Sequence, residues 1–233
     1  MTLKIKNLNE LQDKIGVHFQ NEELLELAFV HKSYVNEHPE VAGYNERLEF
    51  LGDAVLELAV TDFLYHNYPD QPEGQLTNWR SALVKGKNLA RVSRSLGLGE
   101  YLLLSRGEEL SGGRVKDYIL ANTQEALIGA IYLDKGFEMA NQFILRNIVI
   151  LLDEIIAQGL NIDAKSRIQE LAQDRLGVTP RYELLNESGP DHEKTFEMGV
   201  YFGETLAGQG NGPSKQEAEQ AAAKNGLQEK GWA

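Results

Sequence analysis

Apolar residues recur at spacings of three and four along most of the chain up to Ala157, which is the pattern of helices that bury one face. The pattern predicts helices over residues 8–15, 22–31, 45–66, 75–96 with an interruption near Gly86, 116–134 and 137–157. Asn21 is the predicted N-cap of the second helix. Residues 107–114 are predicted to form a glycine-rich loop. The first part of the chain is therefore predicted to be all-helical.

The hydrophobic pattern changes after Gln158. A helix is predicted over residues 164–176, three runs of β-type composition over 181–187, 195–202 and 205–210, and a last helix over 214–228. Ser214 and Glu217 form a capping-box pattern at the start of that last helix. The fold class is therefore an all-α domain followed by an α+β domain of the order α-β-β-β-α. We place the domains at 1–158 and 164–233, with a linker over 159–163.

Three carboxylates interrupt the apolar pattern of the 45–66 helix. At about 100° per residue, Glu46, Glu49 and Asp53 fall within about 60° of one another around the helix axis. On the 116–134 helix, Glu125 follows Asn122 by about one turn on the same side. Both helices are otherwise apolar here, so we expect them to pack face to face with their acidic positions close together.

Clustered carboxylates repel one another, and the repulsion grows when they lie among apolar side chains. A shared proton would relieve the repulsion for one pair. A hard divalent cation, which prefers oxygen ligands, suits three carboxylates better. The alternative interpretation makes these acids ordinary solvated helix positions, which fits a single glutamate but not a set embedded in apolar sequence.

Composition sets wide bounds on the function. The 233 residues suffice for one large or two modest domains, and the absence of cysteine excludes a disulfide framework and thiolate chemistry. The first residues lack the apolar segment of a signal peptide, and no apolar run approaches the roughly 18 residues of a membrane span. We expect a cytoplasmic protein with no membrane partner.

The formal net charge of −12 argues against a nucleic-acid partner, because phosphate binding usually requires a basic surface. The objection weakens if the acids are concentrated in a metal site and basic residues gather locally. Basic residues between the two acidic stretches are Arg80, Lys85, Lys87, Arg91, Arg94, Arg106, Arg114 and Lys116. This stretch either follows a phosphate backbone or is a solvated helix face, and both interpretations stay open.

Two stretches carry a specific resemblance. The string NERLEFLGDAVL at 45–56 closely resembles the signature of bacterial ribonuclease III, and NTQEALIGAIYL at 122–133 resembles that family's second acidic motif. Both occur in the family's order and at its separation. The resemblance implies an all-α ribonuclease III endonuclease domain that cleaves double-stranded RNA with Mg²⁺, or with Mn²⁺ as a substitute.

Site residues follow from the same resemblance. The implied metal ligands are Glu49, Asp53, Asn122 and Glu125, of which Asp53 and Glu125 are also catalytic. Asn122 stands where the family has a fourth acid. Glu46 and Glu73 match two further family acids, which we assign to supporting the metal's water shell or handling RNA.

The second domain resembles a double-stranded-RNA-binding domain, with matching residues at 180–183, 189–192 and 214–223. Such a domain recognises duplex RNA by its shape, across two minor grooves and the phosphates between them. The implied RNA contacts are Gln169, Glu170, Pro190, His192, Ser214, Lys215 and Lys224. His192 is equally consistent with a hydrogen-bonded turn residue. Where the family has a basic cluster, Gln216 and Glu217 follow Lys215, so we expect modest affinity from this domain alone.

The implied reaction is hydrolysis by two metal ions about 3.5–4 Å apart, one activating water and one stabilising the leaving oxygen. The chain has no cysteine, serine-elbow motif or HExxH motif for covalent or zinc catalysis. The resemblance implies 5′-phosphate and 3′-hydroxyl ends with two-nucleotide 3′ overhangs, and processing of ribosomal and other structured RNA precursors. It also implies a homodimer, in which Phe50 is either an interface residue or a plain core aromatic.

Two other classes of function compete with this one. The first is a double-stranded-RNA-binding protein with impaired cleavage, which Asn122 favours because an amide brings no negative charge to a metal site. The second is a helical metal protein without an RNA role, which the acidic net charge favours and the C-terminal domain opposes.

Overall fold

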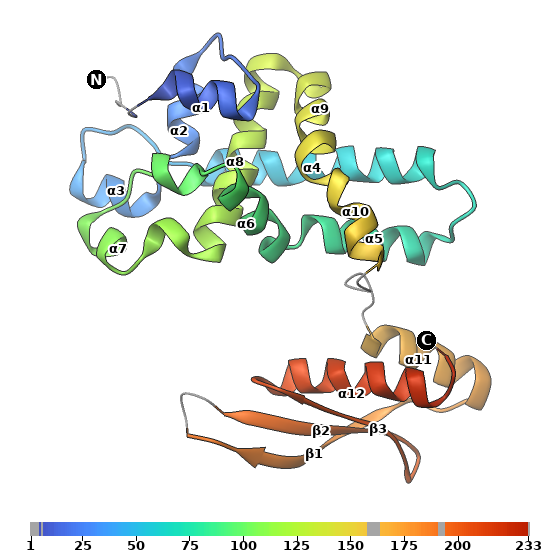
Figure 1. Ribbon diagram of the computed structural model, residues 1–233. Helices are drawn as coiled ribbons and strands as arrows, with labels where there is room; N and C mark the ends of the chain where they lie inside the picture. The colour runs from blue at the N-terminus through green and yellow to red at the C-terminus, as the bar shows by residue number, and fades with distance from the viewer. Residues whose placement is uncertain (1–4, 6, 158–163, 191–193, 233) are drawn as a thin grey trace. The chain divides into compact units, whose positions relative to one another are not determined.

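The computed structural model describes residues 5, 7–157, 164–190 and 194–232 (Figure 1). The chain divides into two compact units, 1–161 and 162–233. The linker predicted over 159–163 lies outside the described residues, as does His192. Each unit is described separately below.

The first unit is built from helices, as the hydrophobic pattern predicts. Its α-helices are α1 (Leu8–Ile15), α2 (Glu22–Ala28), α3 (Lys32–Glu37), α4 (Glu46–Asn67), α5 (Glu73–Val84), α6 (Gly86–Ser95), α7 (Arg106–Leu110), α8 (Asp117–Lys135), α9 (Phe137–Asn147) and α10 (Leu152–Ala157). Three short 3₁₀ helices join them: η1 (Leu98–Tyr101), η2 (Gly113–Val115) and η3 (Val149–Leu151). Asn21 caps α2 as predicted, because its side chain accepts a hydrogen bond from the Glu23 amide.

Three expectations about this unit are wrong in detail. Residues 107–114 are not an open loop, because α7 and η2 occupy most of the segment and the Ser105 side chain caps α7 by accepting from the Glu108 amide. The helix expected over 22–31 ends at Ala28, and a new helix begins after His31. The helix expected over 137–157 is broken by η3. Helices of five or six residues leave too little periodicity to find in a sequence.

Helices α4 and α8 cross at the centre of the unit with their backbones in contact. A Cβ atom at Gly52 would lie 1.8 Å from the Glu125 carbonyl oxygen, and one at Gly129 would lie 2.2 Å from the Leu48 carbonyl oxygen. Only glycine permits so close an approach. Buried side chains on both sides of the crossing belong to one hydrophobic core, which includes Leu56 and Leu127.

The second unit has the predicted order α-β-β-β-α. Its elements are α11 (Ala164–Leu176), β1 (Arg181–Ser188), β2 (Thr195–Phe202), β3 (Thr205–Gly212) and α12 (Lys215–Glu229). The strands form an antiparallel sheet in the order β1-β2-β3, with both helices on one of its faces (Figure 1). Glycines bring β3 close to α12, since a Cβ atom at Gly210 would lie 2.1 Å from the Ala222 nitrogen. The predicted cap of α12 is confirmed: the Ser214 hydroxyl accepts from the Glu217 amide.

We predict that Gly52→Ala lowers the free energy of unfolding by about 3 kcal/mol or more, because the added methyl group overlaps the α8 backbone. Urea unfolding followed by circular dichroism measures this change. Gly74→Ala is the matched control: Gly74 lies in helix α5, where an added Cβ meets no heavy atom within 4 Å. It should leave the stability unchanged or raise it by up to about 1 kcal/mol. Equal effects of the two substitutions would contradict the close crossing.

Candidate active site and RNA-binding surface

The α4–α8 crossing brings the acidic positions of the two helices together. Glu49 and Asp53 lie on α4, on either side of Gly52, and Glu125 lies on α8 with its carbonyl oxygen against Gly52. Asp53 is exposed, whereas the other two carboxylates are partly buried. The predicted clustering of these three residues is therefore present in the structure.

The electrostatics of the cluster show how close the carboxylates are. Burial, followed by repulsion from Asp53 and Glu49, raises the pKa of Glu125 to about 7. Burial and repulsion from Glu46 raise the pKa of Glu49, while a hydrogen bond from Asn122 opposes the rise. Each of these residues is thus within interaction distance of at least one other. In the absence of a neutralising cation, the Glu125 carboxyl therefore keeps its proton to a higher pH than an exposed glutamate does.

The two supporting acids lie differently. Glu46 is exposed and forms an ion pair with Lys32, whose Nζ lies 3.2 Å from Oε1 of Glu46. Lys32 was not among the residues expected near the site, and no periodicity in the sequence places it there. Glu73 begins α5, where its Oε1 accepts from the Thr77 hydroxyl at 3.1 Å. Among the described residues, no interaction joins Glu73 to the acids of α4 and α8.

The donor set fits a hard divalent cation in its chemistry. All its donors are carboxylate or amide oxygens, which Mg²⁺ and Mn²⁺ prefer, and a cation would relieve the repulsion that raises the pKa values of Glu49 and Glu125. As they stand, no three acidic or histidine side chains in the described part of the chain form a group that could hold one ion. Ligation therefore requires side-chain rotation on the fixed helix backbones.

Most of the basic stretch between the acidic motifs is neutralised within the chain. Five of its eight residues form ion pairs: Arg80 with Glu57, Arg91 with Glu154, Arg94 with Asp117, Arg114 with Glu109 and Lys116 with Glu108. The other three residues of the stretch are Lys85, Lys87 and Arg106. None of them has an ion pair among the described residues, and all three are exposed. Neither the expected phosphate-binding surface nor the expected solvated helix face therefore describes the stretch as a whole.

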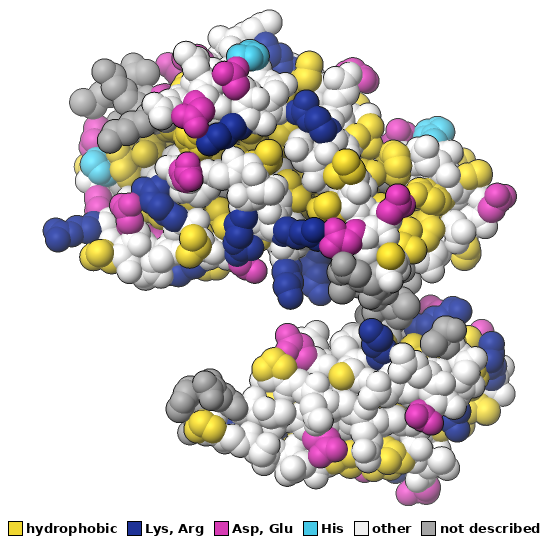
Figure 2. All heavy atoms as spheres, in the orientation of Figure 1, with side chains coloured by type: hydrophobic (Ala, Val, Ile, Leu, Met, Phe, Trp, Pro, Cys, Tyr) yellow, Lys and Arg dark blue, Asp and Glu magenta, His cyan; other side chains and the backbone are white. Residues whose placement is uncertain are grey.

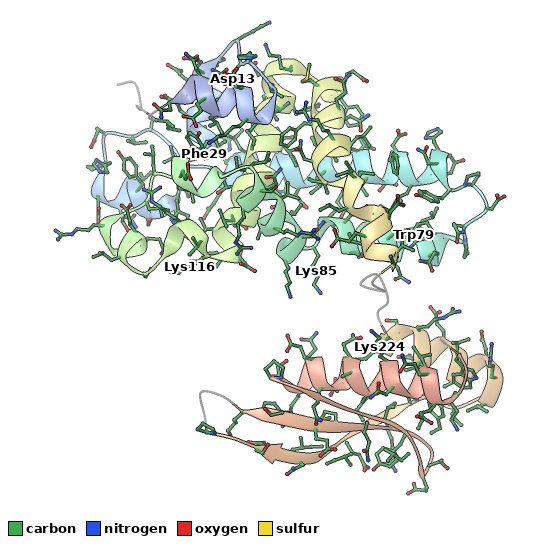
Figure 3. The ribbon with its side chains drawn as sticks, in the orientation of Figure 1. Asp13, Phe29, Trp79, Lys85, Lys116 and Lys224 are labelled. Carbon is green, nitrogen blue, oxygen red and sulfur yellow. The ribbon has the colours of Figure 1, made fainter. Side chains whose placement is uncertain are left out.

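In the second unit, the described residues expected to contact RNA lie on the surface. Gln169 and Glu170 line a shallow hollow of about 540 Å³ on α11, and Pro190 is exposed after β1. At the start of α12, Ser214 and Lys215 are exposed, with Lys215 Nζ 5.8 Å from the centre of the Phe196 ring. Lys224 lies on the same helix and is also exposed (Figure 3).

Phe50 is 82% exposed on α4, which excludes the core interpretation. Leu58 follows Phe50 by eight residues and is 57% exposed. Tyr65 follows Leu58 by seven residues and is 69% exposed. These spacings place the three side chains along one stripe of the helix. That Phe50 lies at a dimer interface stays a prediction.

Comparison with known proteins agrees with both halves of the structure. Residues 21–152 match the family model described as ribonuclease-III-like, and residues 164–230 match the double-stranded RNA binding motif. The chain is 46% identical over 224 residues to ribonuclease 3 of Dehalococcoides mccartyi, covering 96% of this chain and 94% of that protein. It is 45% identical over 229 residues to ribonuclease 3 of Clostridium perfringens, covering 98% and 96%.

Among solved structures, the nuclease domain of ribonuclease III from Campylobacter jejuni matches with a TM-score of 0.57 and 43% identity, covering 61% of this chain and 96% of that one. A helical nuclease domain followed by a double-stranded-RNA-binding domain defines an endoribonuclease acting on double-stranded RNA. The chain belongs to the ribonuclease III family. No helix in its described part is long and apolar enough to cross a membrane.

The raised pKa of Glu125 makes the stability of the metal-free protein depend on pH. Below about pH 4.5 this carboxyl is protonated in both the folded and unfolded states. Between about 4.5 and 7 only the folded state keeps the proton, so the free energy of unfolding falls as the pH rises. At about 1.4 kcal/mol per pKa unit, the total loss is at most about 3.5 kcal/mol.

We therefore predict that Glu125→Gln raises the free energy of unfolding at pH 8, by up to that amount, and changes it little at pH 4.5. Urea unfolding in chelator at the two pH values measures the difference. Glu100→Gln removes an exposed carboxyl and should show no such pH-dependent gain. A Glu125→Gln effect that is the same at both pH values would contradict the burial of a charged carboxylate.

Proposed function

We propose that this endoribonuclease hydrolyses phosphodiester bonds of double-stranded RNA with two divalent cations, Mg²⁺ or Mn²⁺, held at the α4–α8 crossing. The observation that carries the proposal is the contact of α4 and α8 at Gly52, which brings the partly buried Glu125 carboxyl close to the Asp53 and Glu49 carboxylates. When bound, the cations would supply an activated water and stabilise charge on the leaving oxygen.

The chain's own residues would divide the work as follows. Glu49, Asp53 and Glu125 would ligate through carboxylate oxygens, and Asn122 through its amide oxygen. Their helix backbones hold them in place, so the geometry depends on side-chain rotation alone. Glu46, at the exposed start of α4, would support the water shell of the metal. We assign Glu73 to handling RNA, because it begins a different helix.

The products and the substrates of the reaction are also part of the proposal. The products would carry 5′-phosphate and 3′-hydroxyl ends, with two-nucleotide 3′ overhangs when both strands are cut. Substrates would be structured precursors of ribosomal and messenger RNA in the cytoplasm. These expectations rest on membership of the family and on the resemblance of the two acidic motifs.

A homodimer is proposed from the stripe of Phe50, Leu58 and Tyr65, since large apolar side chains in a row on a helix favour burial against a partner. The related Campylobacter jejuni nuclease domain is described as having a region involved in dimer formation. Two copies would supply two cleavage sites, one for each RNA strand.

A cleavage-impaired RNA-binding protein remains the second candidate. Asn122 favours it, because an amide at this position adds no negative charge for a cation and instead hydrogen-bonds to Glu49. Three carboxylates remain beside it, and they are the residues to which the resemblance assigns the core of the metal site. We therefore propose the active enzyme.

We predict that cleavage of labelled duplex RNA requires Mg²⁺ or Mn²⁺ and that Glu125→Gln abolishes it. Binding should persist in the variant, because RNA affinity is spread over a separate domain and over phosphate contacts. Denaturing gels measure cleavage and gel shifts in chelator measure binding. Full cleavage in excess chelator would exclude the metal mechanism. If the wild-type protein binds the RNA in Mg²⁺ but leaves it uncut, the result would favour the second candidate.

A separate prediction concerns Asn122. Asn122→Asp restores a charge at the fourth ligand position, so it should raise the cleavage rate more at low than at high Mg²⁺, with duplex affinity little changed. Cleavage rates across a Mg²⁺ titration would show this as a curve shifted to lower concentration. Coincident curves would mean that this position is not a ligand, and a gain independent of Mg²⁺ would indicate an orienting role.

For the dimer, we predict that Phe50→Asp shifts the protein to a monomer, because a charge would replace the exposed aromatic side chain at the interface. Sedimentation velocity at micromolar concentration measures the change. Leu110→Asp is the control, since Leu110 is 79% exposed on α7, away from the α4 stripe. A wild-type monomer, or equal effects of both variants, would count against the interface.

A further inference from the structure

Lys85 and Lys87 differ from most of the basic residues around them. Both side chains are exposed, and neither has an ion-pair partner among the described residues. The neighbouring Arg91 is held by two hydrogen bonds to Glu154, of 2.9 and 2.7 Å, and Arg94 by Asp117. Lys85 and Lys87 are separated by one residue, so two positive charges without a carboxylate partner among the described residues lie close together in a chain with a net charge of −12.

The position of these lysines on the fold is also distinctive. They flank Gly86 at the junction of α5 and α6, and Figure 3 shows Lys85 projecting outward from the start of α6. Lys and Arg side chains gather over this part of the first unit in Figure 2. The positive end of the α6 dipole repels both cations, which also repel each other. A bound external anion would relieve both repulsions.

The junction is fixed against the helix that carries half of the acidic cluster. A Cβ atom at Gly86 would lie 3.8 Å from Cβ of Ala121, the residue before Asn122 on α8. Further along the same contact, the Ser93 hydroxyl of α6 donates to the Leu120 carbonyl oxygen at 2.7 Å. The two lysines are therefore held at the edge of the α8 segment that leads into the active site.

We propose that Lys85 and Lys87 form the phosphate contact of the nuclease domain, where the backbone of the duplex RNA substrate is held beside α8. This inference rests on the proposed active site, since it is the placement beside Asn122 and Glu125 that selects the substrate as the anion. A duplex presents phosphates at intervals of a few ångströms, so a strand entering the acidic cluster carries further phosphates to its edge.

The contact also resolves an imbalance of charge in the molecule. The acidic cluster repels an RNA backbone, and the net charge of the second domain gives little compensation, because residues 163–233 contain 12 acidic and 8 basic residues. The paired cations of the nuclease domain are already compensated by their own carboxylates. Cations without such partners gain most from a phosphate, because no existing ion pair is lost when they bind it.

The test compares Lys85→Gln/Lys87→Gln with the wild-type full-length chain and with a control, Lys14→Gln/Lys135→Gln. The control removes the same charge from lysines paired with Glu10 and Asp134. Dissociation constants for a duplex RNA, measured in chelator over a range of salt concentrations, give the number of phosphate contacts. Each lost contact lowers the slope of log affinity against log salt by about 0.7 to 0.9.

We expect the Lys85/Lys87 variant to lose about one to two units of slope, and the control to match the wild type. In Mg²⁺, the variant should show a higher KM and an unchanged kcat at saturating RNA. Lys85→Arg/Lys87→Arg keeps both charges and should restore the slope. Thermal unfolding by circular dichroism should be the same for the wild type and both Lys85/Lys87 variants, since these two side chains are exposed.

An unchanged slope for the Lys85/Lys87 variant would overturn the inference, and so would an equal loss in the control, which would reflect net charge alone. A slope that Lys85→Arg/Lys87→Arg fails to restore would overturn it as well. Binding is measured without metal, so this result is independent of catalysis. A wild-type protein that binds RNA but does not cut it would instead remove the proposed function and leave the phosphate contact standing.

Discussion

The contact of α4 and α8 through Gly52 and Gly129 is the constraint on which the rest of the nuclease domain depends. Side chains larger than hydrogen would separate the two backbones at both points. Because Glu49 and Asp53 lie beside Gly52, a separation of the helices would also move their carboxylates away from Glu125. The same contact that completes the core therefore sets the spacing of the acidic cluster, and stability and chemistry are coupled at this crossing.

The charge of the molecule is consistent with RNA binding once the ion pairs are considered. The net charge of −12 is an average over a chain that neutralises most of its nuclease-domain cations internally. The carboxylates at the crossing repel one another, and a hard cation, which prefers oxygen ligands, would relieve that repulsion. The exposed cations without an ion pair among the described residues, Lys85 and Lys87 among them, are the ones that we propose for phosphate contacts.

Much of this arrangement follows from the sequence, because helix periodicity is a local property. The face shared by Glu49 and Asp53 and the capped helix starts at Asn21 and Ser214 follow from spacing alone. The fold class also follows from the change of pattern after the first unit. The resemblance to ribonuclease III supplied the roles of the acids, which their spacing alone leaves open.

Other features have no local signal. The pair of Arg91 and Glu154 joins residues 63 positions apart, so the neutralisation of the basic stretch is visible only in three dimensions. The Lys32–Glu46 pair depends in the same way on how α3 lies against α4. In the sequence, Gly52 indicates a position that lowers the stability of the helix. In the structure, glycine is required there because the backbone of α8 lies against it.

The most direct test of the central claim is a titration of Mn²⁺ into the full-length protein without RNA, with free Mn²⁺ followed by electron paramagnetic resonance. The proposed metal site predicts saturable binding that Asp53→Asn or Glu49→Gln weakens strongly, while Glu73→Gln, on a separate helix, changes it little. Equal binding by the wild type and all three variants would contradict the assignment of the metal site to the α4–α8 crossing.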